Sequence, residues 1–167
     1  MTSPVKHRGG RQELEQGCVV PRRTTPAHME GQTLEPDTST RQTRGTVLVS
    51  CLDEDARRIC AHCLAHAGYD VHEVEDADEV MGLARAARPD VIITSYPTFT
   101  SLGVPLTALV RHDTMLSQTP VLSLTSWAEE EYLAAAAADG VSLSLPMPVR
   151  LESLLGAVDQ LARRATN

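Results

Sequence analysis

The stretch Thr46-Val-Leu-Val-Ser-Cys-Leu-Asp-Glu-Asp-Ala-Arg57 joins a short aliphatic run to an acidic segment. Short runs rich in Val and Leu are typical of strands that are buried on both faces of a parallel sheet. Acidic residues directly after such a run are typical of a helix N-terminus, where they cap the helix and interact favourably with its dipole. The stretch therefore predicts a buried strand followed by a helix, which is the repeating unit of an α/β fold.

Four more apolar runs follow, at 70–74, 91–93, 121–124 and 141–145. Amphipathic patterns predict helices over 54–67, 76–87, 104–113, 126–138 and 150–164. Asp76 and Ser126 are the expected N-caps of two of these helices, and Gly140 is the expected stop of the fourth. Five strands that alternate with five helices predict a doubly wound, parallel five-stranded sheet covered on both faces.

The spacing of apolar residues also predicts which helix faces are buried. In the last helix the expected apolar face consists of Leu151, Leu154, Leu155, Val158 and Leu161. In the first helix we expect one face to carry Ile59, Cys60, Cys63, Leu64 and Ala67.

Charge and apolar content divide the chain near residue 45. Residues 1–45 contain seven Lys or Arg, five Asp or Glu, nine apolar residues, four prolines and no aromatic residue. Such a segment cannot bury enough surface to offset its ordering entropy, so we predict a disordered tail over 1–45 and a domain over 46–167. Three roles of the tail stay open: a leader without function, a tether, or a segment upstream of a true start at Met29.

Composition excludes several classes of protein. No apolar stretch approaches the roughly 18 residues of a membrane-spanning helix, and no apolar segment follows Lys6, Arg8 and Arg11 as in a secretory signal. We therefore expect a cytoplasmic protein that has no membrane partner. The chain is acidic, with a net charge of −7 and few aromatic residues, which argues against nucleic-acid binding. The cysteines are too few and too irregularly spaced for a disulfide framework; they are Cys18, Cys51, Cys60 and Cys63.

Six short segments of the predicted domain occur in a characteristic order. They are residues 46–57, Ala-Gly-Tyr-Asp-Val at 67–71, Arg-Pro-Asp-Val-Ile-Ile at 88–93, Thr-Pro-Val-Leu-Ser-Leu-Thr at 119–125, Ala-Asp-Gly at 138–140, and Pro148. Together they resemble the receiver domain of bacterial response regulators over about residues 46–164. The resemblance implies a flavodoxin-like (βα)5 fold and a role in two-component phosphorelay signalling.

The resemblance also implies a site at the carboxyl ends of the strands. In receivers an acidic pair ends the first strand, a phospho-acceptor Asp ends the third, a Thr or Ser ends the fourth, and a Lys precedes a Pro after the fifth. The carboxylates hold Mg²⁺, and the metal and the Lys neutralise charge on the phosphoryl group. At these places the present chain has, in order, Cys51 and Leu52, Ser95, Thr125, and Met147 before Pro148.

Only Thr125 and Pro148 keep the family pattern, and residues 46–167 contain no lysine. We therefore predict a degenerate, or pseudo-receiver, site that is not phosphorylated on Asp, binds no Mg²⁺ or other cofactor and has no catalytic residue. Two alternatives stay open. Asp53, Glu54 and Asp55 either provide some Mg²⁺ affinity or only cap the first helix. Ser95 is either a substrate for a kinase acting in trans or a polar filler at the strand end.

The cysteines admit functional and structural interpretations. Cys60-Ala-His62-Cys63 followed by His66 has the spacing of metal ligands on one helix. The favoured interpretation is that both cysteines pack in the core as small apolar residues and that His62 faces solvent. Cys51 lies near a helix N-terminus, which lowers a thiol pKa and would suit redox sensing, although the neighbouring acids act in the opposite direction.

The sequence also contains a candidate interface. We place Trp127 at the start of the fourth helix and Tyr132 farther along it, on the surface of the fourth helix, fifth strand and fifth helix that receivers use for dimers and effectors. The alternative is that Trp127 folds over the vacated pocket and closes it.

The chain contains no phosphate-binding loop, dinucleotide fingerprint or nucleophile elbow, so we expect no enzyme. We predict a stand-alone receiver-like signalling module that acts through protein–protein contacts. Its partner would be a histidine kinase, another regulator or a second copy. The rival hypothesis is a small-molecule sensor that uses the vacated pocket.

Overall fold

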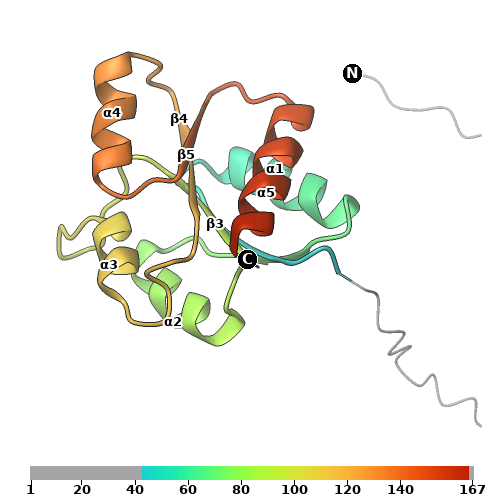
Figure 1. The fold of residues 1–167 in the computed structure, drawn as a ribbon, viewed down its shortest axis with the longest axis horizontal. Coiled ribbons are helices and arrows are strands. Elements are labelled where there is room, and N and C mark those ends of the chain that lie inside the picture. The colour runs from blue at the N-terminus through green and yellow to red at the C-terminus, as the bar shows by residue number, and fades with distance from the viewer. Residues whose placement is uncertain (1–42, 166–167) are drawn as a thin grey trace, which may run out of the picture. The chain divides into compact units, whose positions relative to one another are not determined.

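A computed structural model describes residues 43–165, and they form one parallel sheet whose strands are covered by helices (Figure 1). The predicted tail lies outside the described residues, apart from its last three. The strands are β1 (Thr46–Ser50), β2 (Asp70–Glu73), β3 (Val91–Ser95), β4 (Val121–Thr125) and β5 (Leu143–Pro146). The helices are α1 (Glu54–His66), α2 (Ala77–Ala87), α3 (Leu106–His112), α4 (Glu130–Ala138) and α5 (Leu151–Ala165).

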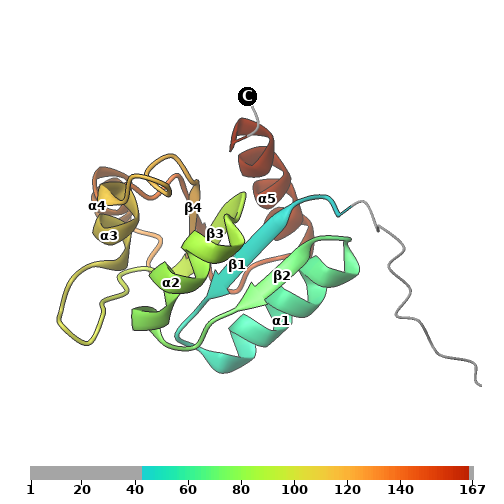
Figure 2. The same ribbon diagram turned by 90° about the horizontal axis from the view of Figure 1, so that it is seen from below.

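The strand order is β2-β1-β3-β4-β5, with every pair parallel, which confirms the predicted doubly wound flavodoxin-like fold. Figure 2 shows β1 and β2 side by side with α1 lying along them. Alternate strand residues point to opposite faces, so β1 contributes Val47 and Val49 to one core cluster and Leu48 to the other. The first cluster packs under α1 and α5, and the second under α2, α3 and α4.

Two of the predicted helix boundaries are confirmed by their caps. The Asp76 Oδ1 atom accepts a hydrogen bond from the Asp78 N–H at 2.9 Å, which makes Asp76 the N-cap of α2. The C-terminal boundary of α4 also agrees with the prediction, because the helix ends at Ala138, two residues before Gly140, which has a φ of +94°.

The predicted start of the fourth helix is wrong. The helix begins at Glu130 and not at Ser126, and the N-cap residue Glu129 makes no side-chain capping bond. The Thr125 Oγ1 atom accepts a hydrogen bond from the Trp127 N–H at 3.1 Å, so a local turn holds these residues outside the helix.

The buried faces of α1 and α5 differ from the predicted ones. The buried residues of α1 are Arg57, Cys60, Ala61 and Leu64, which have i, i+3, i+4, i+7 spacing. Ile59 lies about 100° around the helix from Cys60 and is 62% exposed, so its predicted place in the core is wrong. Leu151 is also exposed, because it is the first residue of α5 and precedes the part of the helix that packs on the sheet.

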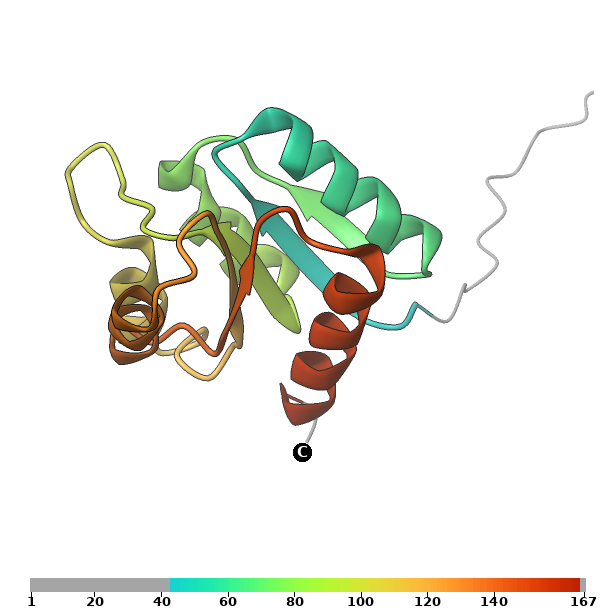
Figure 3. The ribbon, with the colours of Figure 1, turned by 90° about the horizontal axis from the view of Figure 1, so that it is seen from above.

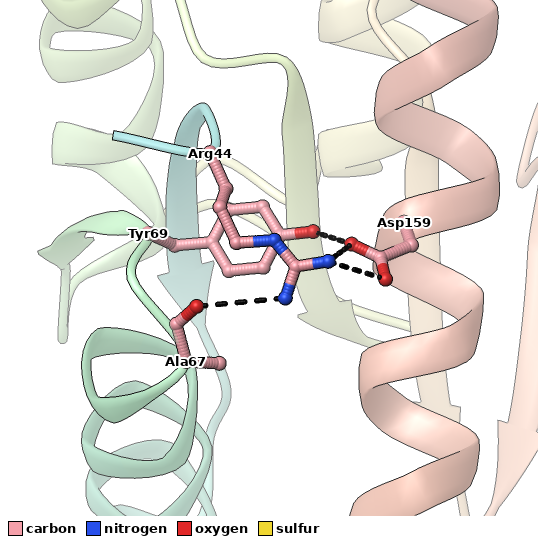
Figure 4. A network of polar contacts seen from close by, with 4 residues as sticks. All are labelled: Arg44, Ala67, Tyr69 and Asp159. Carbon is pink, nitrogen blue, oxygen red and sulfur yellow. Dashed lines mark hydrogen bonds and ion pairs between the residues drawn. The ribbon is translucent and has the colours of Figure 1, made fainter. Parts of the chain in front are cut away.

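A polar network ties α5 to the beginning of the sheet (Figure 4). The Arg44 Nη2 atom donates to both carboxylate oxygens of Asp159 in α5, at 2.9 and 2.8 Å. The Tyr69 hydroxyl donates to the same carboxylate, and the Arg44 guanidinium lies 5.4 Å from the centre of the Tyr69 ring. The network lies where the strands begin, and we call this side of the domain the amino edge.

Replacement of Gly140 by Ala is expected to destabilise the domain by about 1–3 kcal/mol, because an L residue is strained at that φ. A Cβ atom there would also lie 2.7 Å from Cγ of Arg111, whose side chain donates to the Gly140 carbonyl. Gly82→Ala is a matched control in α2, where an added Cβ meets nothing within 4 Å and is expected to stabilise the helix by about 0.5–1 kcal/mol. Urea unfolding of both variants measures the difference, and equal effects would contradict the prediction.

Candidate functional site

The carboxyl ends of β1, β3, β4 and β5 surround a cleft of about 450 Å³. Open parallel sheets bind ligands at this edge, which we call the carboxyl edge. The structure brings six of the predicted pocket residues together at the cleft: Cys51, Leu52, Asp53, Ser95, Thr125 and Met147. Pro148 follows Met147 and is exposed, but it does not line the cleft.

The hydroxyl side chains that end β3 and β4 hold the loops that follow these strands. Ser95 ends β3, and its Oγ atom accepts a hydrogen bond from the Leu52 N–H at 3.1 Å. Thr125 ends β4, and its Oγ1 atom likewise accepts a hydrogen bond from the Trp127 N–H. Both side chains therefore position backbone that forms the walls of the cleft.

With the lining residues that the structure describes, the cleft offers Mg²⁺ a single carboxylate, whereas octahedral Mg²⁺ sites are usually held by one or two carboxylates together with water and phosphate oxygens. Asp53 supplies the carboxylate of the lining, and its Oδ1 atom accepts from the Ala56 N–H at 2.7 Å as the N-cap of α1. Glu54 is paired with Arg58 at 2.8 Å. In the part of the chain that the structure describes, no group of three His, Cys, Asp or Glu side chains is placed to hold a metal.

The cysteine side chains are arranged as packing residues. Cys60 is buried in the core cluster below α1, Cys63 is partly buried and His62 is exposed, as the packing interpretation predicts. Burial raises the pKa of the Cys51 thiol from 9.0 to about 12, with a smaller contribution from Cys60. The hypothesis of a lowered Cys51 pKa is therefore not supported, because burial and the nearby charges of Cys60 and Asp53 raise the pKa.

Trp127 lies at the rim of the cleft, in the loop between β4 and α4. Its ring stacks on that of Tyr132 in α4, with centroids 5.0 Å apart and planes inclined by 15°. The Trp127 side chain lines the cleft and is also 49% exposed. It therefore contributes to the cleft wall without closing the cleft, and it also forms exposed aromatic surface with Tyr132.

The segment after β3 contributes cleft residues that were not predicted from the sequence. Tyr96 and Pro97 line the cleft, and the Tyr96 hydroxyl donates to Asp139. The rest of this loop projects from the body of the domain (Figure 3). The sequence did contain a signal for this contribution: Tyr96 and Pro97 directly follow a predicted buried strand, and residues at that position lie at the carboxyl edge of a parallel sheet.

The fold and this edge define the class of protein. Residues 52–159 match the response regulator receiver domain, and the chain belongs to that family. Within residues 43–165 no helix is long and apolar enough to cross a membrane.

Several solved structures are similar. The chemotaxis response regulator CheY4 of Vibrio cholerae is 30% identical, with a TM-score of 0.63 over 71% of this chain and 99% of that chain. A response regulator from Desulfuromonas acetoxidans is 18% identical, with a TM-score of 0.66 over 71% and 97% of the two chains. The signal receiver domain of a histidine kinase from Syntrophus aciditrophicus is 20% identical, with a TM-score of 0.62 over 72% and 91%. A search of curated protein sequences finds no match. The domain is thus a receiver domain of the two-component signalling type.

Proposed function

We propose that this domain is a pseudo-receiver that accepts no phosphoryl group on Asp and signals through protein–protein contacts. The observation that carries the proposal is Ser95 at the end of β3, where the family places the acceptor Asp. The Ser95 Oγ atom already accepts a hydrogen bond from the loop after β1. A strand end of this kind lacks the carboxylate that forms an acyl phosphate.

The charges around the cleft support the same proposal. A phosphoryl group is stabilised by cations, and residues 46–167 contain no lysine. Arg57 lies beneath the loop after β1 but is buried, where it donates to the Cys51 carbonyl at 3.0 Å and lies 3.7 Å from Glu75. Its guanidinium therefore supports the loop rather than a ligand in the cleft.

The partner that fits this proposal is a protein such as a histidine kinase or another regulator, encountered in the cytoplasm. A homodimer through α4, β5 and α5 is a further form of the same proposal, since Tyr132 is exposed on α4. Partner binding would shift the population of conformations in place of phosphorylation.

Trp127 is the only Trp in the chain and lines the cleft, so its fluorescence tests the proposal. Mg²⁺ is titrated with and without beryllofluoride, a mimic of the aspartyl phosphate. We expect no saturable change that needs both reagents. A change that needs both and disappears in Asp53→Asn would overturn the proposal, because it would show that Asp53 supports a working phosphorylation site.

A small-molecule sensor is the second candidate function, and the volume of the cleft favours it. The 450 Å³ cleft is within the range of ligand pockets, about 300–1,000 Å³, and its lining includes Leu52, Leu124 and Met147. A ligand that binds only the folded state raises the melting temperature. Stabilisation by one metabolite in a thermal-shift panel, abolished by Met147→Glu, would favour the sensor over the protein-binding module.

A further inference from the structure

Exposed apolar side chains gather at the carboxyl edge. Eight of the ten large apolar residues that are exposed in residues 43–165 belong to loops or first helical turns there. We call this set the apolar rim: Leu52, Phe99, Leu102, Val104, Trp127, Tyr132, Met147 and Leu151. Exposed apolar side chains gathered at one edge in this way commonly mark an interaction site.

The loop between β3 and α3 holds part of the apolar rim in a defined shape (Figure 3). Phe99 and Pro105 form an antiparallel bridge, and the Thr100 N–H donates to the Val104 carbonyl at 3.0 Å. The Ser101 N–H donates to Asp78 Oδ1 at 3.0 Å, which anchors the loop tip to α2. Leu102, at the tip of this hydrogen-bonded loop, is 88% exposed. A loop whose backbone is already ordered costs less conformational entropy to bind than a mobile loop.

Acidic side chains surround the apolar rim. The first turns of α1, α2, α4 and α5 all lie at the carboxyl edge, and all of them contain Asp or Glu. Basic residues on the same segments are fewer: Arg57 is buried, Arg58 is paired with Glu54, and Arg150 is exposed. We call the exposed acidic residues the acidic ring: Asp53, Glu54, Asp55, Glu75, Asp76, Asp78, Glu79, Glu129, Glu130, Glu131 and Glu152.

We infer that the carboxyl edge is a docking surface for a basic amphipathic segment of another protein. Apolar side chains of that segment would enter the cleft between Leu52, Trp127 and Met147, and its Lys or Arg side chains would pair with the acidic ring. Charge complementarity decides against a second copy whose own carboxyl edge faces this surface, because two acidic rings facing each other would repel. The inference rests on the proposed function and adds the position of the contact and the chemistry of the partner.

Synthetic peptides test the inference through Trp127 fluorescence. The probe is a short peptide of Leu and Lys with helical spacing, compared with a Leu–Glu peptide and with a Ser–Lys peptide of equal charge. We expect saturable binding of the Leu–Lys peptide alone, weakened by added salt because the pairs with the acidic ring are exposed. Equal binding of the Leu–Lys and Ser–Lys peptides would overturn the inference, since it would show attraction by charge alone.

Two double variants locate the contact. Leu52→Ser with Leu102→Ser removes part of the apolar rim, and we expect it to weaken binding of the Leu–Lys peptide by at least about tenfold. Ile59→Ser with Met115→Ser is the matched control, because both residues are exposed apolar side chains away from the carboxyl edge. All four positions are exposed and Trp127 is retained, so the fold and the fluorescence reporter are preserved.

An equal loss of peptide affinity in the two variants, or no binding of the peptide to the unmodified domain, would overturn the inference of a docking surface. A flat beryllofluoride response in the same preparation would leave the pseudo-receiver proposal standing.

Discussion

The free energy of unfolding is expected to fall steeply as the pH rises above 9, because two buried thiols resist ionisation in the folded state. Burial raises the pKa of Cys51 from 9.0 to about 12 and that of Cys60 to about 11. In the unfolded chain both thiols lose their protons near pH 9, so the unfolded state binds fewer protons above that pH. The stabilisation is complete below pH 9 and is lost as the pH rises towards the folded-state pKa values.

The expected size is large for a domain of this kind. Each thiol contributes a slope of about 1.4 kcal/mol per pH unit while it is ionised only in the unfolded state. Between pH 9 and pH 11 the two thiols together remove about 4 kcal/mol, because each slope is only partly developed at pH 9 and Cys60 begins to ionise in the folded state near pH 11. This loss approaches the whole stability of a marginally stable domain. Burial also raises the pKa of Tyr69 and Tyr96 to about 12, with hydrogen bonds to Asp159 and Asp139 acting in the same direction, so both add to the loss above pH 10.

Urea unfolding between about pH 8 and pH 11 under reducing conditions measures this slope. The control is the double variant Cys51→Ala, Cys60→Ala, which lowers stability below pH 9 through its cavities but flattens the slope above pH 9. A slope that is unchanged in the double variant would contradict the assignment to the thiols. Slow labelling of Cys51 by iodoacetamide at neutral pH is the expected companion result, because the thiol is protonated and buried.

Leu64→Ala is expected to destabilise the domain by about 3–5 kcal/mol, whereas Ile59→Ala in the same helix changes stability by less than about 0.5 kcal/mol. Leu64 is 0% exposed in the core cluster that joins α1 to α5 and the sheet. Ile59 is mostly exposed, and its replacement even slightly favours the helix, because Ala has the higher helix propensity. Similar losses in the two variants, measured by urea unfolding, would show that α1 packs through a different face.

This pair of residues also shows what the sequence could predict. The strand positions followed from short Val- and Ile-rich runs such as Val91-Ile92-Ile93, because strands buried on both faces leave that pattern whatever packs on them. The exposure of Ile59 could not be read in the same way. Apolar residues at 59, 60, 63 and 64 cover more than one helix face, and only the position of the sheet selects the face centred on Cys60 and Leu64.

The sequence predicted most of the residues that line the candidate site, but it did not predict the conformations of the loops that carry them. Strand ends placed Cys51, Ser95 and Thr125 at one edge, because parallel strands share their direction. The start of α4 was not predictable from Ser126. Ser126 is a residue type that often caps helices, but the hydrogen bond from the Trp127 N–H to Thr125 Oγ1 forms a turn at this position instead. The shape of the loop after β3 likewise depends on contacts between distant segments, such as Ser101 with Asp78.

The network of Arg44, Tyr69 and Asp159 has a practical consequence for attaching the domain to anything else. It joins the first described residues to the last turns of α5 at the amino edge, so both ends of the described domain lie on the side opposite the carboxyl ends of the strands. A fluorophore, a solid support or a fused protein linked at either end would therefore leave the carboxyl edge facing solution.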